Sequence, residues 1–195
     1  MENGSLTRTL QVLSKNSSEW PVPQKTDLIP PGYKAGEKLA FILDNVFTKE
    51  ECDELIRVSE ERGYEQALVN IGGGRLRFLR YVPGEYFKPH HDGVYSRDNG
   101  EASLITVQIY LNEGFKGGST TFLSLDEDEG VECVPKIGRV LIFEHRLYHE
   151  GSLLKKGQKY AIRTDVMYTP PVYKSQNQDT RLMGRESPPV VPERK

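Results

Sequence analysis

Alternation of apolar and polar residues predicts that the middle of the chain is built from β-strands. Residues 105–112 and 159–168 alternate with a period of two, which is the side-chain period of a strand. The aliphatic faces comprise Ile105, Val107, Ile109 and Leu111 in the first segment and Tyr160, Ile162, Thr164 and Val166 in the second. The opposite faces comprise Thr106, Gln108, Tyr110 and Asn112, and Lys159, Ala161, Arg163 and Asp165. If the polar faces turn inward, the pattern suits a jelly roll with a polar site between its sheets. If they turn outward, the strands simply cover a core.

Further strands are predicted at residues 38–45, 75–80 and 140–143, and one helix is predicted after Thr48. Thr48 and Glu51 have the spacing of a capping box, and Phe47 can pack on Cys52. Gly63 is expected to end the helix. The stripe expected to face the core comprises Cys52, Leu55, Ile56 and Ser59.

The composition changes along the chain and predicts three regions. Residues 1–36 are rich in Ser, Asn, Lys and Pro and are expected to form a loosely packed arm that could lend one edge strand. Residues 37–173 are expected to form one domain with a real core. Residues 174–195 are rich in polar residues and Pro, which predicts a flexible tail.

Charge and hydropathy exclude several classes of function. The chain has 195 residues and a net charge of −2 with dispersed charges, so we expect no nucleic-acid surface. It has neither an apolar run of membrane-spanning length nor a basic segment followed by an apolar one at its start. We therefore expect a cytoplasmic protein with no membrane span, in which Cys52 and Cys133 are reduced thiols.

A candidate metal site begins at His90 and Asp92, which lie two residues apart and so on one face of an extended chain. Two His and one carboxylate leave three adjacent coordination positions open, as non-heme Fe(II) oxygenases require. The second His could be His145 or His149. No Glu follows His145, so these two do not form a helical zinc motif. On their own, His90 and Asp92 could also be two surface residues at the end of a strand.

Four blocks of sequence, in this order, resemble the prolyl 4-hydroxylase branch of the 2-oxoglutarate/Fe(II) dioxygenases. They are residues 81–92, residues 109–112, residues 117–122, and His149 followed ten residues later by Lys159. The resemblance runs from about Leu39 to Tyr168. It implies a mainly β (α+β) fold, a double-stranded β-helix or jelly roll, with a few flanking N-terminal helices.

The resemblance also implies roles for individual residues. His90, Asp92 and His149 would be the Fe(II) ligands and catalytic residues, and His145 would support them from outside the ligand set. Lys159 would bind the far carboxylate of 2-oxoglutarate, and both Tyr110 and Tyr81 would line the same pocket. Arg163 shares the face of Lys159; it could bind 2-oxoglutarate at its chelating end or pair with Asp165.

The implied reaction is hydroxylation of an aliphatic C–H with O₂, in which 2-oxoglutarate is converted to succinate and CO₂. Ascorbate is a candidate reductant. The carboxylate at Asp92 favours hydroxylation over halogenation. The partners are then the co-substrate and a peptide or small-molecule prime substrate: a peptidyl proline, a free amino acid and another metabolite all stay open. The alternative is a non-catalytic jelly-roll domain that binds a metal or senses a ligand.

A triple glycine, Gly72 to Gly74, precedes Arg75 and Arg77 and could act as the hinge of a loop that closes over the substrate. On this reading Arg75 and Arg77 would bind a carboxylate or a peptide backbone of the prime substrate. The alternative is a flexible hairpin with solvated arginines.

Overall fold

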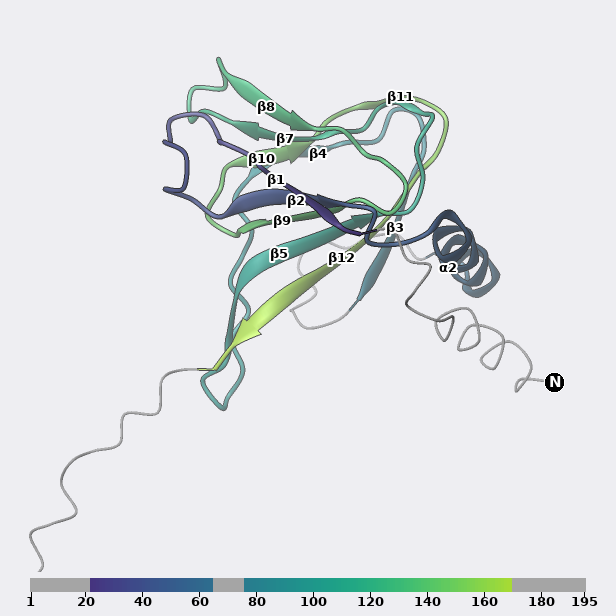
Figure 1. Ribbon diagram of the computed structural model, residues 1–195, viewed down its shortest axis with the longest axis horizontal. Coiled ribbons are helices and arrows are strands. Elements are labelled where there is room, and N and C mark those ends of the chain that lie inside the picture. Colours follow the sequence, from purple (N-terminus) through teal and green to yellow (C-terminus); the bar gives the residue numbers. More distant parts are fainter. Residues whose placement is uncertain (1–21, 65–75, 170–195) are drawn as a thin grey trace, which may run out of the picture.

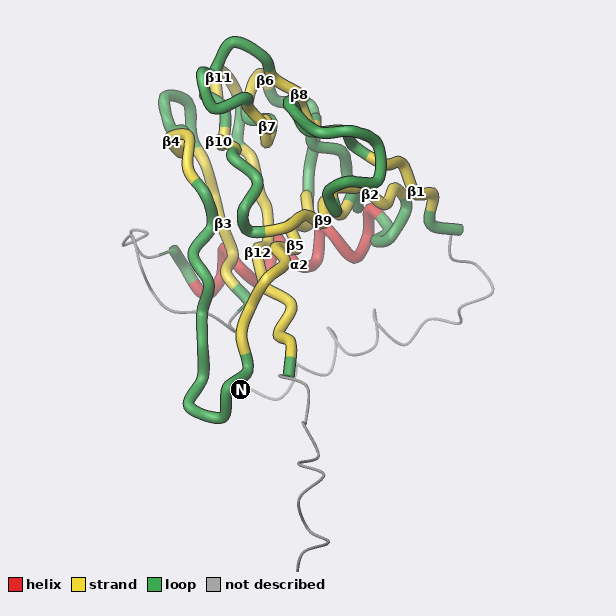
Figure 2. Tube along the Cα trace, turned by 90° about the vertical axis from the view of Figure 1, so that its left-hand side faces the viewer, coloured by secondary structure: helices red, strands yellow, loops and turns green. Residues whose placement is uncertain are grey.

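Two antiparallel sheets form the body of the protein in a computed structural model that describes residues 22–64 and 76–169 (Figure 1). The larger sheet has six strands in the order β1 (Gln24–Asp27), β2 (Ala40–Asp44), β9 (Val140–Glu144), β5 (Ala102–Tyr110), β12 (Lys159–Tyr168) and β3 (Arg77–Tyr81). The smaller has four, in the order β4 (Phe87–His90), β10 (His149–Gly151), β7 (Thr120–Leu123) and β8 (Gly130–Cys133). Two short strands, β6 (Lys116–Gly117) and β11 (Leu154–Lys156), pair beside them. The arrangement confirms the predicted mainly β jelly roll, and Figure 2 shows its two layers from the side.

One helix, α2 (Lys49–Arg62), lies within the described residues and matches the predicted one. The capping box is present: the Glu51 amide donates to Thr48 Oγ1, and the Thr48 amide donates to the Glu51 carboxylate. The helix ends at Gly63, whose φ of 77° is readily adopted by glycine. The predicted helix boundaries are therefore confirmed.

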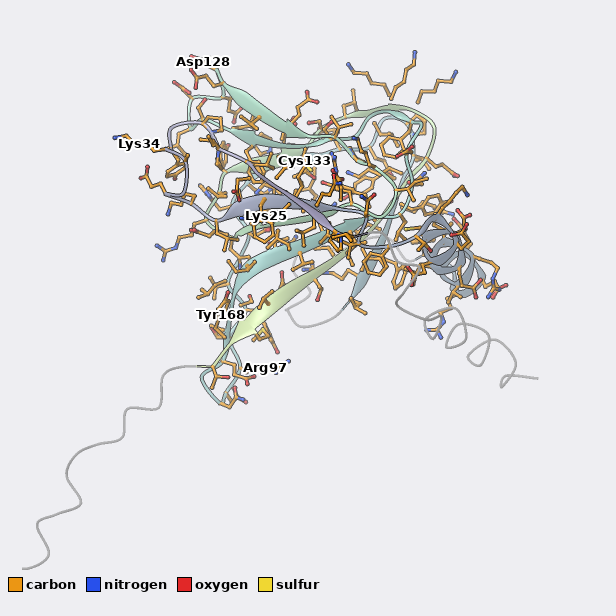
Figure 3. The ribbon with its side chains drawn as sticks, in the orientation of Figure 1. Lys25, Lys34, Arg97, Asp128, Cys133 and Tyr168 are labelled. Atoms are coloured by element: carbon orange, nitrogen blue, oxygen red, sulfur yellow. The ribbon has the colours of Figure 1, made fainter. Side chains whose placement is uncertain are left out.

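Two clusters of buried side chains divide the core. The larger lies between the sheets and contains Ala40, Ile42, Tyr110, Phe122, Cys133, Leu141, Phe143, Leu147 and Ala161. Figure 3 labels Cys133 in this interior and Asp128 at the outer tip of the β7–β8 hairpin. The smaller cluster joins α2 to β5 and β12 and contains Cys52, Leu111, Tyr160 and Ile162, with Phe47, Leu55, Ile56 and Ile109 against it. The aliphatic faces therefore meet the helix, and the polar faces of β5 and β12 turn inward.

A glycine fixes α2 against the large sheet. Gly138 has a φ of 71°, and a Cβ there would lie 2.0 Å from the carbonyl oxygen of Phe47. The Gly138 carbonyl accepts from the amides of Val46 and Phe47, just before the helix begins. A side chain at position 138 would break this close approach.

β1 lies within residues 1–36 and is an edge strand of the large sheet, paired with β2. The sequence had suggested that this segment could lend one edge strand. The predicted domain limits at 37 and 173 stay a prediction, and the tail at 174–195 lies outside the described residues. Within the described ranges, no helix has both the length and the apolar character needed to cross a membrane.

Candidate metal and co-substrate site

His90, Asp92 and His149 form one group, with ligand atoms all within 4.8 Å of one another. His90 and His149 are register partners on β4 and β10, so their side chains lie on the same face. Their ring centroids are 4.4 Å apart. Asp92 follows two residues after His90, and its backbone amide donates to the carbonyl of His145. The structure thus brings together three residues that the sequence separates into two segments.

Both histidines are oriented so that one ring nitrogen is free for a metal. His90 Nδ1 lies 2.7 Å from the Lys88 carbonyl oxygen, and His149 Nδ1 lies 2.8 Å from that of Leu147. A carbonyl can only accept, so Nδ1 carries the hydrogen in each ring and Nε2 keeps its lone pair. The two Nε2 atoms lie 3.4 Å and 3.8 Å from carboxylate oxygens of Asp92. Burial lowers the pKa of His149 to about 4, which keeps it neutral at physiological pH.

Asp92 is 8% exposed and is held in its ionised form. Burial alone would raise the pKa of its carboxyl, but the charge of Arg163 and the hydrogen bond from Thr106 hold it well below its usual range. Thr106 Oγ1 donates to Asp92 Oδ2 at 2.5 Å, and Arg163 Nη2 lies 2.6 Å from Asp92 Oδ1. An anionic carboxylate and two neutral imidazoles are the donor set that suits a divalent metal such as Fe(II).

His145 lies outside this group. It follows β9 in a turn, is 2% exposed, and places its Nε2 3.4 Å from Asp165 Oδ1. Its carbonyl supports Asp92 through the backbone bond described above. The predicted choice of His149 over His145 as the third member therefore agrees with this geometry, while the roles of these residues remain predictions.

Lys159 provides a buried cation near the metal group. It is 3% exposed, its Nζ donates to the Gly118 carbonyl at 2.6 Å, and Nζ lies 4.9 Å from the ring centroid of Tyr81 and 5.5 Å from that of Tyr110. Among the described residues, no carboxylate pairs with it. Burial lowers the pKa of Lys159 to about 8.

Tyr110 joins the lysine to the small sheet. Its buried hydroxyl donates to Thr120 Oγ1 at 2.8 Å, and burial raises its pKa well above the ordinary value. Thr120 and Phe122 are alternate residues of β7, and Phe122 is the register partner of His149. The lysine pocket and the metal group therefore lie about two strand residues, or about 7 Å, apart along β7.

The remaining predicted residues divide into those the structure describes and those it does not. Arg163 contacts Asp92 and lies 3.9 Å from Asp165, so it stands at the metal group rather than beside Lys159. Arg77 Nη2 lies 3.7 Å from Asp165 Oδ2. Gly72 to Gly74 and Arg75 lie outside the described residues. Sequence reasoning missed the contact of Thr106 with Asp92, although the inward polar face of residues 105–112 was the signal for it.

Comparison with known proteins places the site in a family. Residues 76–164 match the 2OG-Fe(II) oxygenase superfamily. Prolyl 4-hydroxylase 1 of Arabidopsis thaliana is 27% identical over 110 residues, covering 46% of this chain and 39% of that protein. Prolyl 4-hydroxylase 5 of the same plant is 30% identical over 80 residues, covering 39% of this chain and 28% of that protein. The chain thus spans less than half the length of these curated relatives.

A solved structure supports the fold. The viral collagen prolyl hydroxylase of Paramecium Bursaria Chlorella virus-1, in its 2OG complex, superposes with a TM-score of 0.51 at 22% identity, covering 69% of this chain and 98% of that one. At 22% identity, the similarity supports a shared fold only. His90, Asp92, His149 and Lys159 all lie inside the region that matches the superfamily. Residues 76–164 therefore resemble the 2OG-Fe(II) oxygenase superfamily, and the chain is prolyl 4-hydroxylase-like.

Proposed function

We propose that the chain is an Fe(II)- and 2-oxoglutarate-dependent dioxygenase that hydroxylates an aliphatic C–H. The superfamily match and the His-Asp-His group support Fe(II), 2-oxoglutarate and O₂ as its cofactors. The observation that carries the proposal is Lys159, a buried ammonium without a carboxylate partner among the described residues. Burying an unpaired charge is unfavourable, so such a group is expected where an anionic ligand binds.

The spacing of the site fits this co-substrate. The terminal carbons of an extended five-carbon diacid are about 5 Å apart. The pocket of Lys159 and the ligand His149 are separated by about 7 Å along β7. We assign the far carboxylate to Lys159, supported by Tyr110 and Tyr81, and the keto acid end to the metal group.

When bound, Fe(II) and 2-oxoglutarate supply the oxidising chemistry: O₂ is cleaved, one oxygen atom enters succinate with loss of CO₂, and the other enters the substrate C–H bond. The residues of the chain hold and orient these partners. The carbonyls of Lys88 and Leu147 fix the two imidazoles, and Thr106 and Arg163 fix the carboxylate of Asp92. The aromatic ring of Phe143 packs against His149, with the two ring centroids 4.7 Å apart. This apolar ring helps to keep water from that side of the site.

An anaerobic titration tests the proposal. Addition of Fe(II) and then 2-oxoglutarate should produce the weak visible charge-transfer band of the chelate, and admission of air should release succinate. His149→Ala should abolish the band, whereas His145→Ala, a change of the same type outside the ligand group, should retain it. If His145→Ala lost the band and His149→Ala kept it, His145 rather than His149 would be the metal ligand.

The competing function is a domain that binds metal or ligand without turnover. It would give the same band but no succinate in air, with or without candidate substrates. The aerobic step therefore separates the two functions.

A further inference from the structure

Two arginines lie side by side on the inner face of the large sheet, next to the metal group. Arg77 on β3 and Arg163 on β12 are register partners on adjacent antiparallel strands. Their side chains therefore project from the same face. Arg163 reaches Asp92, which identifies this face as the one toward the metal group. Like charges directly opposite each other destabilise a sheet, so this pair needs an explanation.

The carboxylate between the arginines does not satisfy them. Asp165 lies 3.7 Å from Arg77 and 3.9 Å from Arg163, distances too long for a hydrogen bond. Among the described residues, Arg163 Nε, Asp165 Oδ1 and both ring nitrogens of His145 are buried and have no hydrogen-bond partner. Buried polar atoms are nearly always paired, so this set points to a polar group that the site receives from outside.

The balance of charge gives the sign of that group. With the metal bound, two guanidiniums and a divalent cation face the carboxylates of Asp92 and Asp165, which leaves two positive charges. 2-Oxoglutarate brings two negative charges to a site where Lys159 adds one positive charge. Counting the described residues alone, one positive charge then remains uncompensated.

We propose that Arg77 and Arg163 together bind a carboxylate of the prime substrate. The proposal rests on the proposed function and narrows its substrate class to small organic acids, free amino acids included, or chains with a terminal carboxylate. Paired guanidiniums suit a planar carboxylate because each can donate two parallel hydrogen bonds. The carbon that is hydroxylated then lies within a few bonds of that carboxylate, since Arg163 touches a metal ligand. An internal peptidyl proline lacks such a group.

The test uses acetate as a probe for the carboxylate, with acetamide as its neutral counterpart. The protein is loaded anaerobically with Fe(II) and saturating 2-oxoglutarate, and each probe is titrated at constant ionic strength. Perturbation of the visible band and the shift in thermal midpoint are the readouts, so no turnover is needed. We expect saturable binding of acetate and none of acetamide.

Three variants make the test specific. Arg77→Gln should weaken acetate binding by about ten-fold or more, as loss of a charged hydrogen bond does. Arg80→Gln is the matched control: it removes the same charge from the same strand, but Arg80 points to the other face, where it pairs with Glu60 at 3.1 Å. Asp165→Asn should tighten acetate binding, because it removes the competing carboxylate. If Asp165 only held the arginines in place for folding, Asp165→Asn would weaken acetate binding instead.

The outcomes separate the two proposals. The carboxylate site would be overturned if acetate and acetamide behaved alike, or if Arg77→Gln and Arg80→Gln bound acetate equally. A normal visible band in the same experiment would leave the cofactor assignment unaffected. Absence of the band with 2-oxoglutarate would overturn the proposed function itself. If acetate binds as expected, aerobic assays with L-proline and L-prolinamide, and with a proline-ended peptide and its amide, distinguish a free acid from a chain end.

Discussion

Burial of Lys159 without a carboxylate partner should make the protein less stable than it would be with an apolar residue there. The pKa of Lys159 falls from 10.5 to about 8 because burial disfavours its charged form. Each pH unit of such a difference corresponds to about 1.4 kcal/mol. The charged ammonium therefore costs the fold about 3 kcal/mol at pH 7 in the absence of 2-oxoglutarate.

The sign of the pH dependence follows from the same values. Between about pH 8 and 10.5 the unfolded chain holds the Lys159 proton more tightly than the folded chain does, so stability from this group rises with pH. Lys159→Met removes the effect. The difference in unfolding free energy, variant minus wild type, should thus fall by about 3 kcal/mol between pH 7 and pH 10.5. Its absolute value at pH 7 is smaller than the charge term, because the Gly118 carbonyl loses its donor at a cost of about 1–3 kcal/mol.

Urea unfolding of metal-free protein at several pH values measures this difference. Titrating groups that do not interact with Lys159 are common to both proteins and cancel. Lys156→Met, at an exposed lysine of β11, is the control for loss of a lysine from the surface. Addition of 2-oxoglutarate to the Fe(II)-loaded proteins should stabilise the wild type and Lys156→Met more than Lys159→Met, which keeps its metal ligands but loses the cation for the far carboxylate. A constant difference for Lys159→Met across this range would refute the argument, since it would mean that the ammonium is already solvated or paired.

Three further predictions concern single side chains. Tyr110→Phe should raise the KM for 2-oxoglutarate about five-fold, the value of one hydrogen bond, in a succinate assay; an unchanged KM would remove Tyr110 from the pocket. Thr106→Val should lower Fe(II) affinity by about 10–100-fold, measured by competition with a chelator, because Asp92 loses its donor; unchanged affinity would contradict this. Gly138→Ala should lower the unfolding free energy by about 2–3 kcal/mol through strain at its positive φ and collision with Phe47, and an unchanged melting temperature would count against it.

Local rules predicted much of this structure. The period-two faces of residues 159–168 agree with β12, because alternation is set by the strand itself. The capping box at Thr48 was predictable because its bonds join residues three apart. The prediction of His149 came from the resemblance, because Lys159 follows it by ten residues; in the structure His145 follows β9 in a turn and His149 begins β10.

Contacts that depend on strand pairing were not predictable in the same way. Arg77 and Arg163 lie opposite each other because of the register between β3 and β12, two strands that are far apart in sequence. A shift of one residue would have turned Arg77 away from the metal group. The same holds for Thr106 and Asp92, whose contact needs β5 and the end of β4 to meet across the two sheets.

The two cations of β12 explain how one strand can serve two ligands. Lys159 and Arg163 are four residues apart on the same face, about 13 Å along an extended chain. Ala161 lies between them and is buried in the core cluster between the two sheets. Arg163 touches Asp92 at one end of this face, and Lys159 lies in the pocket of Tyr110 at the other. On the two proposals above, the co-substrate enters from the Lys159 end and the prime substrate from the Arg163 end, so the strand itself keeps the two acids apart.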